Sequence, residues 1–192
     1  HDDVPLVIPE INGDDALRHS GIISNPNCST IITLMAVYPL HRLSPIERMV
    51  VSTYQAVSGA GRDGMEELIA QNKATAEGRE TESHAFAHRI AENLIPKIGS
   101  LSDDDYTSEE MKMQNEGRKI LHAPTLAVTC TCVRVPVMRS HSISAAVYTR
   151  DSISVSAAKK AIGDFSGDIL YDAPEADIYP MPIVAEGKID VY

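Results

Sequence analysis

The sequence predicts an α+β fold in which helices cover an open mixed β-sheet. Residues 48–54 and 125–137 are rich in β-branched residues and favour buried strands. Apolar residues follow a helical spacing after Cys28, and a helix-start signature opens residues 107–121. Because these elements do not alternate regularly, we expect a mixed sheet rather than a series of parallel βαβ units. The 192 residues, 43% of them hydrophobic, suffice for one globular domain or one and a part.

The composition argues against several classes of partner. The net charge is −10 and no basic run is present, which disfavours nucleic acid and anionic membrane surfaces. No apolar stretch approaches the roughly 18 residues of a membrane span, and no signal peptide is visible. Three cysteines form no disulfide framework and fit a reducing cytoplasm. The chain starts at His1, so we expect it to begin within a longer protein.

The first 40 residues lead to a single cysteine at a predicted strand–turn–helix junction. Residues 4–9 favour a short strand, residues 11–20 a turn and a short helix, and Ile22-Ile23 the end of another strand. The turn Asn25-Pro26-Asn27 follows, because proline fixes its own φ and disfavours helix before it. We expect Pro39 to end or kink the next helix near residue 38.

Cys28 stands at the start of that helix. The helix dipole and the unpaired N–H groups of a helix N-terminus lower the pKa of a thiol, so a thiolate nucleophile is plausible here. A small buried residue in a helix start would leave the same pattern. On spacing alone the two interpretations are equally supported.

The strand at residues 48–54 runs into a glycine-rich turn at residues 55–61. A helical pattern follows the turn over residues 65–70. A glycine-rich turn in this place can bring backbone N–H groups near an anion, or it can simply reverse the direction of the chain. Chain reversal is the commoner role. The polar residues 71–83 favour an exposed helix end or a loop. His84 and His88, four residues apart, lack a third metal ligand, so a surface helix is expected and no metal site is predicted.

The second half of the chain carries the strongest strand. Thr107-Ser108-Glu109-Glu110 is a helix-capping signature, and Glu116 and Lys119 share a face of the helix that follows, as a surface ion pair would. In the strand at 125–137, Cys130, Cys132 and Arg134 alternate onto one face. We interpret the cysteines as core thiols rather than a Cys-x-Cys metal site. A buried arginine requires an anionic partner.

The remaining elements are shorter. We expect a strand at residues 144–148, an amphipathic helix at 154–162, and short strands at 169–171 and 183–184. No internal repeat and no linker interrupt this order.

Four motifs stand in a familiar order. They are Asn25-Pro26-Asn27-Cys28-Ser29-Thr30, Tyr54-Gln55-Ala56-Val57-Ser58-Gly59-Ala60-Gly61, Glu109-Glu110-Met111-Lys112 with Glu116-Gly117-Arg118-Lys119-Ile120, and Arg134-Val135-Pro136-Val137 with His141. Together they resemble the aspartate-semialdehyde dehydrogenase family over nearly the whole chain. The resemblance implies the fold of the C-terminal domain of glyceraldehyde-3-phosphate dehydrogenase-like enzymes.

The resemblance also implies a reaction and a set of site residues. The reaction interconverts β-aspartyl phosphate and aspartate 4-semialdehyde with NADPH, in the biosynthesis of lysine, threonine and methionine, by a cytoplasmic homodimer. Cys28 corresponds to the thiol that forms a thioester and His141 to its acid/base partner. The substrate-binding residues would be Gln55, Glu116 for the amino group, Lys119 for phosphate and Arg134 for the α-carboxylate. Ser58 and Gly59 would contact NADP.

One departure from the family concerns the cofactor domain. Residues 1–20 hold no glycine-rich dinucleotide turn, so we expect residues 1–28 to be the end of the nucleotide-binding domain and residues 29–192 the catalytic and dimerisation domain. The closing strand and helix of the family would follow Tyr192. A dimerisation fragment without activity, or a related N-acetyl-glutamyl-phosphate reductase, remains an alternative. Those reductases typically carry Gly where Asn27 stands.

Overall fold

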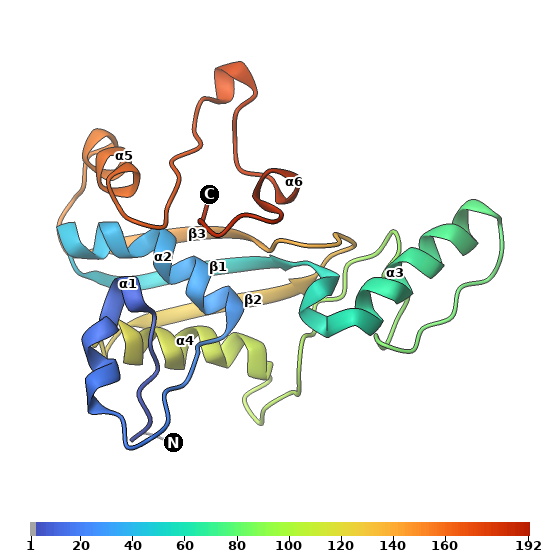
Figure 1. The fold of residues 1–192 in the computed structure, drawn as a ribbon, viewed down its shortest axis with the longest axis horizontal. Coiled ribbons are helices and arrows are strands. Elements are labelled where there is room, and N and C mark those ends of the chain that lie inside the picture. The colour runs from blue at the N-terminus through green and yellow to red at the C-terminus, as the bar shows by residue number, and fades with distance from the viewer. Residues whose placement is uncertain (1–2) are drawn as a thin grey trace.

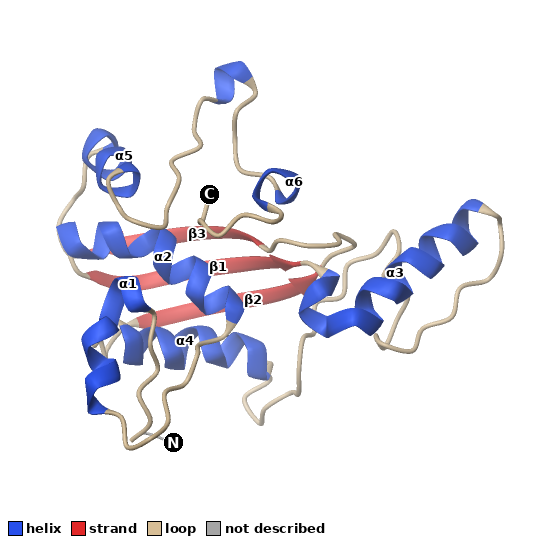
Figure 2. Cartoon of the chain, viewed as in Figure 1, coloured by secondary structure: helices blue, strands red, loops and turns tan. Residues whose placement is uncertain are grey.

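A computed structural model describes residues 3–192 and confirms the predicted α+β class. Its centre is a three-stranded sheet in the order β2-β1-β3 (Figures 1 and 2). The strands are β1 (Ile46–Gln55), β2 (Ala127–Arg134) and β3 (Ser142–Thr149). The sheet is mixed, since β1 runs parallel to β2 and antiparallel to β3.

Helices surround the sheet and fill the connections. The α-helices are α1 (Pro9–Asn12), α2 (Cys28–Leu43), α3 (Gly61–Ala76), α4 (Ser108–Ile120), α5 (Val155–Gly163) and α6 (Pro182–Ala185). Three 3₁₀ turns complete them, η1 (Gly13–Arg18), η2 (Val57–Ala60) and η3 (Pro174–Ala176). Among the described residues, no helix is both long and apolar enough to cross a membrane.

Within residues 3–192, helices cover one face of the sheet and leave the other open. Met49 and Val51 of β1 and the thiols of β2 pack against Leu34 of α2 and Met113 of α4, all with less than 5% of their surface exposed. The side chains that point the other way are open: Val50, Tyr54 and Tyr148 are 44%, 43% and 47% exposed. The alternation of strand residues therefore builds a core on one side and leaves an accessible surface on the other.

The strand pairing gathers chemically active residues at one edge of the sheet. Gln55, the last residue of β1, lies opposite Arg134, the last residue of β2, in the parallel register. The antiparallel strand β3 begins at the same edge, so His141 precedes it there. Residues that are far apart in the sequence thus meet beside the start of α2 at Cys28.

Two elements that contain proline differ from expectation. Helix α2 does not end near residue 38: Pro39 is buried inside it, and the helix continues to Leu43. Proline removes one backbone hydrogen bond, and the packing of the helix on the core outweighs that loss. The expected strand at 183–184 is instead the short helix α6, in which Pro182 occupies the favourable first position.

Several short elements also differ from expectation. Residues 4–9 and 22–24 contribute a single bridge, Leu6 to Ser24, rather than full strands. Residues 169–171 are irregular beside the bridge between Asp168 and Val191. His84 and His88 lie in a loop rather than on a helix. Each of these segments is too short for periodicity to specify its state, and long-range contacts decide it.

Asp168 is a buried carboxylate near α2. It is 7% exposed, and among the described residues neither of its oxygens has a hydrogen-bond partner. Burial, aided by the nearby negative charge of Glu10, raises the pKa of Asp168 to about 6. Between about pH 4 and pH 6 the folded protein therefore keeps a proton on Asp168 that the unfolded chain has released. As the pH rises through this window, the contribution of Asp168 to the free energy of unfolding falls.

We predict that Asp168→Asn stabilises the protein at pH 7.5 by about 2 kcal/mol, because it removes a buried charge. At pH 4 the native carboxyl is protonated and the gain should vanish. Urea unfolding at both pH values measures the difference. Asp103→Asn, in an exposed loop, is the matched control and should change neither value; an equal gain for Asp168→Asn at both pH values would contradict the assignment.

Candidate active site

Asn27 caps the helix that carries Cys28. Its Oδ1 accepts hydrogen bonds from the N–H groups of Ser29 (3.0 Å) and Thr30 (3.3 Å). The predicted strand–turn–helix junction is thus confirmed at the turn and the helix, with Cys28 as the first helical residue. The thiol is exposed, so the alternative of a buried small residue does not hold.

His141 lies directly beside this thiol. Its Nε2 is 3.3 Å from the Cys28 Sγ, and its Nδ1 accepts a hydrogen bond from the Ala56 N–H at 3.0 Å. Because Nδ1 accepts, the neutral imidazole carries its proton on Nε2, the nitrogen that faces the sulfur. Burial, and next the positive charge of Arg134, lowers the pKa of His141. The ring is therefore neutral at pH 7 and donates toward the sulfur.

Arg134 is held on the same side of the site. Its Nη1 donates to the Ala56 carbonyl at 2.7 Å, and its side chain is almost fully buried. The structure confirms that Arg134 shares a face with Cys130 and Cys132. Gly59 makes room for it, since a Cβ there would lie 2.7 Å from Nη1 and 3.4 Å from the His141 ring. The segment from Ala56 to Gly59 therefore contacts both the Arg134 and the His141 side chains and helps to position them.

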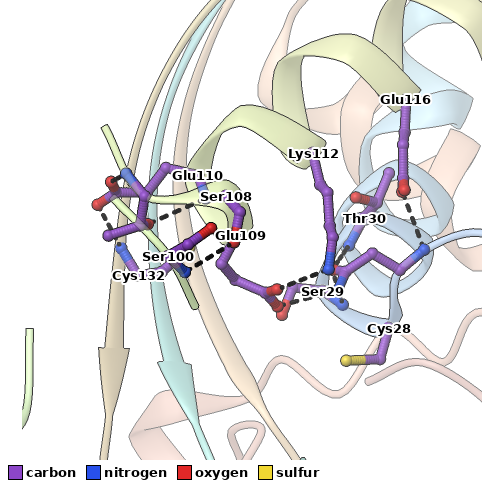
Figure 3. Close-up of polar contacts among 12 residues, drawn as sticks. Cys28, Ser29, Thr30, Ser100, Ser108, Glu109, Glu110, Lys112, Glu116 and Cys132 are labelled. Atoms are coloured by element: carbon purple, nitrogen blue, oxygen red, sulfur yellow. Dashed lines mark hydrogen bonds and ion pairs between the residues drawn. The ribbon is translucent and has the colours of Figure 1, made fainter. Parts of the chain in front are cut away.

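Glu109 is a site residue that the sequence did not reveal. Its Oε1 accepts from the side-chain amides of Asn27 and Gln55, each at 2.9 Å, and Lys112 lies 3.3 Å from its Oε2. Burial alone would raise the pKa of Glu109, but the two amides and Lys112 together hold the pKa below its ordinary value. Figure 3 shows Lys112 directed from α4 toward the N-terminus of α2. A buried anion and a cation therefore adjoin Cys28.

Glu116 and Lys119 have different surroundings. The Glu116 carboxylate accepts from the Asn27 N–H at 2.9 Å (Figure 3), and Lys119 donates to the Val4 carbonyl at 2.8 Å. The structure therefore brings Glu116 to the backbone of the cap and Lys119 to the N-terminal segment. Their shared helix face binds other parts of the chain rather than forming an ion pair between the two side chains.

Ser58 lines a cavity beside the thiol. This cavity has a volume of about 650 Å³ and is bounded by Cys28, His141, apolar residues of α2 such as Ile32, and the C-terminal segment up to Tyr192. Ser58 and Gly59 both belong to η2, which follows β1 directly. The predicted cofactor-contacting residues are thus next to the candidate nucleophile.

The other two cysteines are unlike Cys28. Cys130 and Cys132 are buried with their sulfur atoms 3.6 Å apart. No group of three or more His, Cys, Asp or Glu residues able to hold a metal occurs within residues 3–192. The structure supports their interpretation as core thiols.

Glu109 stands in a sequence motif that already has another explanation. Thr107 and Glu110 form the predicted capping box, with both of its hydrogen bonds present. That motif accounts for the acidic pair at the helix start, so nothing local distinguishes Glu109 from a first-turn acid. Its partners Asn27 and Gln55 lie 82 and 54 residues away.

Comparisons with known proteins point to one family. The family described as "Semialdehyde dehydrogenase, dimerisation domain" matches residues 37–192. Aspartate-semialdehyde dehydrogenase of Aquifex aeolicus (strain VF5) is 46% identical over 193 residues, covering 99% of this chain and 57% of the relative. The Bacillus subtilis (strain 168) aspartate-semialdehyde dehydrogenase is 42% identical over 199 residues, with coverages of 100% and 58%.

A solved structure is also similar. The crystal structure of aspartate semialdehyde dehydrogenase II complexed with ASA from Vibrio cholerae aligns with a TM-score of 0.94 at 40% identity. The alignment covers 98% of this chain and 56% of that chain. The present chain therefore spans little more than half the length of the relatives it matches.

We predict that Asn27→Ala slows the alkylation of Cys28 several-fold and costs about 2 kcal/mol of unfolding free energy, because both the helix cap and a hydrogen bond to a buried charge are lost. Iodoacetamide labelling followed by peptide mass spectrometry measures the rate at pH 7. Ser154→Ala, which removes the cap of α5, is the control: it should cost about 1 kcal/mol and leave Cys28 labelling unchanged. Equal labelling rates in the two variants would contradict a role for Asn27 in activating the thiol.

Proposed function

The chain belongs to the semialdehyde dehydrogenase family through its dimerisation domain, and we propose that it carries the catalytic thiol of an aspartate-semialdehyde dehydrogenase. The observation that carries this proposal is the exposed Cys28 at a helix N-terminus, 3.3 Å from the Nε2 of His141. The proposed reaction interconverts β-aspartyl phosphate and aspartate 4-semialdehyde within the biosynthesis of lysine, threonine and methionine.

Cys28 acts as the nucleophile. Its thiolate attacks the acyl-phosphate carbonyl, the tetrahedral oxyanion collapses, and phosphate leaves to give a thioester on sulfur. The helix N-terminus and the Nε2–H of His141 stabilise the thiolate before attack. His141 can serve as a base only by moving the Nε2 proton to Nδ1, which breaks its hydrogen bond from Ala56. Its acid/base role is thus coupled to that bond.

Arg134 and Glu109 recognise the amino-acid part of the substrate. A guanidinium offers two parallel donors to the α-carboxylate, and Arg134 uses one Nη1 bond on the protein. The Glu109 carboxylate, which accepts a hydrogen bond from Gln55, pairs with the ammonium group of the substrate. We propose Glu109 for the role that the resemblance gives to Glu116, because Glu116 is engaged with the backbone of Asn27.

Lys112 is the proposed phosphate-binding cation. It is about half exposed next to Glu109 and points toward the helix start at Cys28 (Figure 3). A compact ammonium at that place offsets the charge of the departing phosphate. Lys119, which the resemblance suggests for this role, donates to the Val4 carbonyl; we propose that it supports the N-terminal segment and contributes to the phosphate site from a greater distance.

The residues near Cys28 fit a nicotinamide cofactor. The cavity of about 650 Å³ beside Cys28 and Ser58 has an apolar wall from α2 that suits an aromatic ring. Gly59 leaves open the space next to the His141 ring. NADP would supply the hydride that reduces the thioester. We propose that Ser58 and Gly59 hold the nicotinamide end and that residues 1–28 belong to the domain that binds the rest of it.

We predict that iodoacetamide labels Cys28 at least about tenfold faster than Cys130 or Cys132 at pH 7, because Cys28 is exposed at a helix N-terminus and the others are buried. Aspartate semialdehyde with phosphate should slow the labelling of Cys28 alone. Equal labelling of all three thiols in the folded protein would refute a reactive Cys28. Turnover of aspartate semialdehyde, phosphate and NADP, lost in Cys28→Ala, then separates a complete enzyme from a folded module with an intact site.

Homodimerisation through the open sheet face is the second proposed function. The face without helices carries Val50, Tyr54 and Tyr148, with Arg48 stacked 4.0 Å from the Tyr148 ring centroid. A flat surface of exposed apolar and small side chains on a sheet favours a symmetric contact with a second copy. The three free thiols agree with assembly in the reducing cytoplasm.

We predict that Val50→Glu shifts the sedimenting species from dimer to monomer, raising the dissociation constant at least about tenfold, because two like charges would meet across the symmetry axis. Val155→Glu is the matched control, since Val155 is apolar and exposed on α5, away from the sheet face. Sedimentation velocity over a concentration series measures both variants. A dimer unaffected by Val50→Glu would exclude this face as the interface.

A further inference from the structure

An arm of the molecule, residues 57–95, projects beyond the strand ends at the site. It contains α3 and the loop that returns from it (Figure 1). Its own small apolar cluster consists of Val57, Leu68, Ile90, Ala91 and Ile95. The proposed function uses Ser58 and Gly59 at the base of this arm and assigns nothing to α3 or to the returning loop.

Two buried polar side chains of α3 hold the returning loop. The Glu67 carboxylate accepts from the backbone N–H groups of His84 and Ala85. Gln71, only 2% exposed, accepts from the N–H groups of Ile90 and Ala91 at 2.9 and 3.0 Å. The expectation that the polar stretch beginning at Gln71 is exposed is therefore wrong at this residue. The two side chains fix the loop on both sides of residues 86–89.

Phe86 is the large apolar side chain within this fixed stretch. It packs on the cluster of Val57 and Leu68, and a Cβ at Gly64 would lie 3.0 Å from its ring. Its ring centroid is 5.9 Å from the Arg134 Cζ, within the range of a cation–π contact. Phe86 thus links the apolar cluster of the arm to the guanidinium of the site.

The arm holds the backbone of Arg134 as well. Ile95 and Arg134 exchange two backbone hydrogen bonds, at 3.0 and 2.9 Å. The guanidinium is then bounded by the Ala56 carbonyl, the Gly59 backbone and the Phe86 ring. A long arginine side chain loses its rotamer freedom only where such contacts surround it.

We propose that Phe86, held by the Glu67 and Gln71 clamp of α3, is a positioning residue that aims the Arg134 guanidinium at the carboxylate of the substrate. The inference rests on the proposed function, in which Arg134 binds that carboxylate. Phe86 supplies a negative ring face to one side of the cation and leaves its remaining N–H donors free for the ligand. The clamp fixes the loop on both sides of Phe86, so this placement does not depend on the exposed surface of the arm.

The alternative role for Phe86 is apolar filling of the arm. Leucine fills a similar space but has no ring face, whereas tyrosine keeps the ring. A structural role predicts that Phe86→Leu and Phe86→Tyr differ only in stability. A positioning role predicts that Phe86→Leu changes how an anion reaches Cys28 and that Phe86→Tyr does not.

The test compares two alkylating probes of Cys28 on the full chain. Iodoacetate carries a carboxylate that Arg134 attracts, and iodoacetamide is its neutral counterpart, so the ratio of their rates reports the guanidinium without requiring turnover. We expect Phe86→Leu to lower this ratio about threefold while the iodoacetamide rate stays within a factor of two. Phe86→Tyr should keep the ratio of the native protein. Phe165→Leu, whose ring packs on Tyr38, is the matched control and should also keep it.

A second pair of variants tests the clamp. Glu67→Gln removes the charge that holds the His84 and Ala85 N–H groups, so the ratio should fall and hydrogen exchange at Ala85 should accelerate. Glu66→Gln is its control, because Glu66 lies on the same helix, more than half exposed, and pairs with Arg62. It should alter neither measurement.

The outcomes separate this inference from the proposed function. A ratio lowered by Arg134→Lys and by Phe86→Leu, but kept by Phe86→Tyr, supports both. A ratio lowered by Arg134→Lys but unchanged by Phe86→Leu overturns the positioning role alone. If Arg134→Lys leaves the ratio unchanged, Arg134 does not bind carboxylates, and the inference falls together with that part of the proposed function.

Discussion

The buried carboxylate of Glu109 is the interaction on which the rest of the site depends. A charge removed from water is costly unless donors surround it, and here the donors come from separate elements: Asn27 before α2, Gln55 at the end of β1, and Lys112 on α4 itself. Displacing any one element leaves the charge incompletely paired. The position of Cys28 relative to the sheet is therefore set by an electrostatic requirement as well as by apolar packing.

Local sequence patterns predicted those parts of the site whose positions follow from helix and strand geometry. The Asn-Pro-Asn turn and the helical spacing placed Cys28 at a helix start, and Asn27 indeed caps that helix. Strict alternation in β2 placed Arg134 on the face of the buried thiols. Both rules act over a few residues, so one sequence suffices to apply them.

The parts that were missed depend on partners far along the chain. Glu109 was hidden within a capping box, and Gln71 within a polar stretch that reads as exposed; each is buried because residues elsewhere satisfy it. Pro39 was expected to end or kink α2 near residue 38, and the helix instead continues to Leu43. The local sequence does not distinguish a buried polar residue from an exposed one, because polar residue types are far commoner at the surface. Only the tertiary pairing distinguishes the two.

The mixed pairing of the sheet explains why these long-range contacts converge. The parallel pair β1 and β2 ends with Gln55 opposite Arg134, and the antiparallel β3 starts beside them after His141. An all-antiparallel order would send one of these ends to the far side of the sheet. A parallel pair needs a long crossover, and here that crossover contains both α3 with the arm and α4 with Glu109. The connection that the topology requires is thus also the source of the groups that hold Gln55 and Arg134 in place.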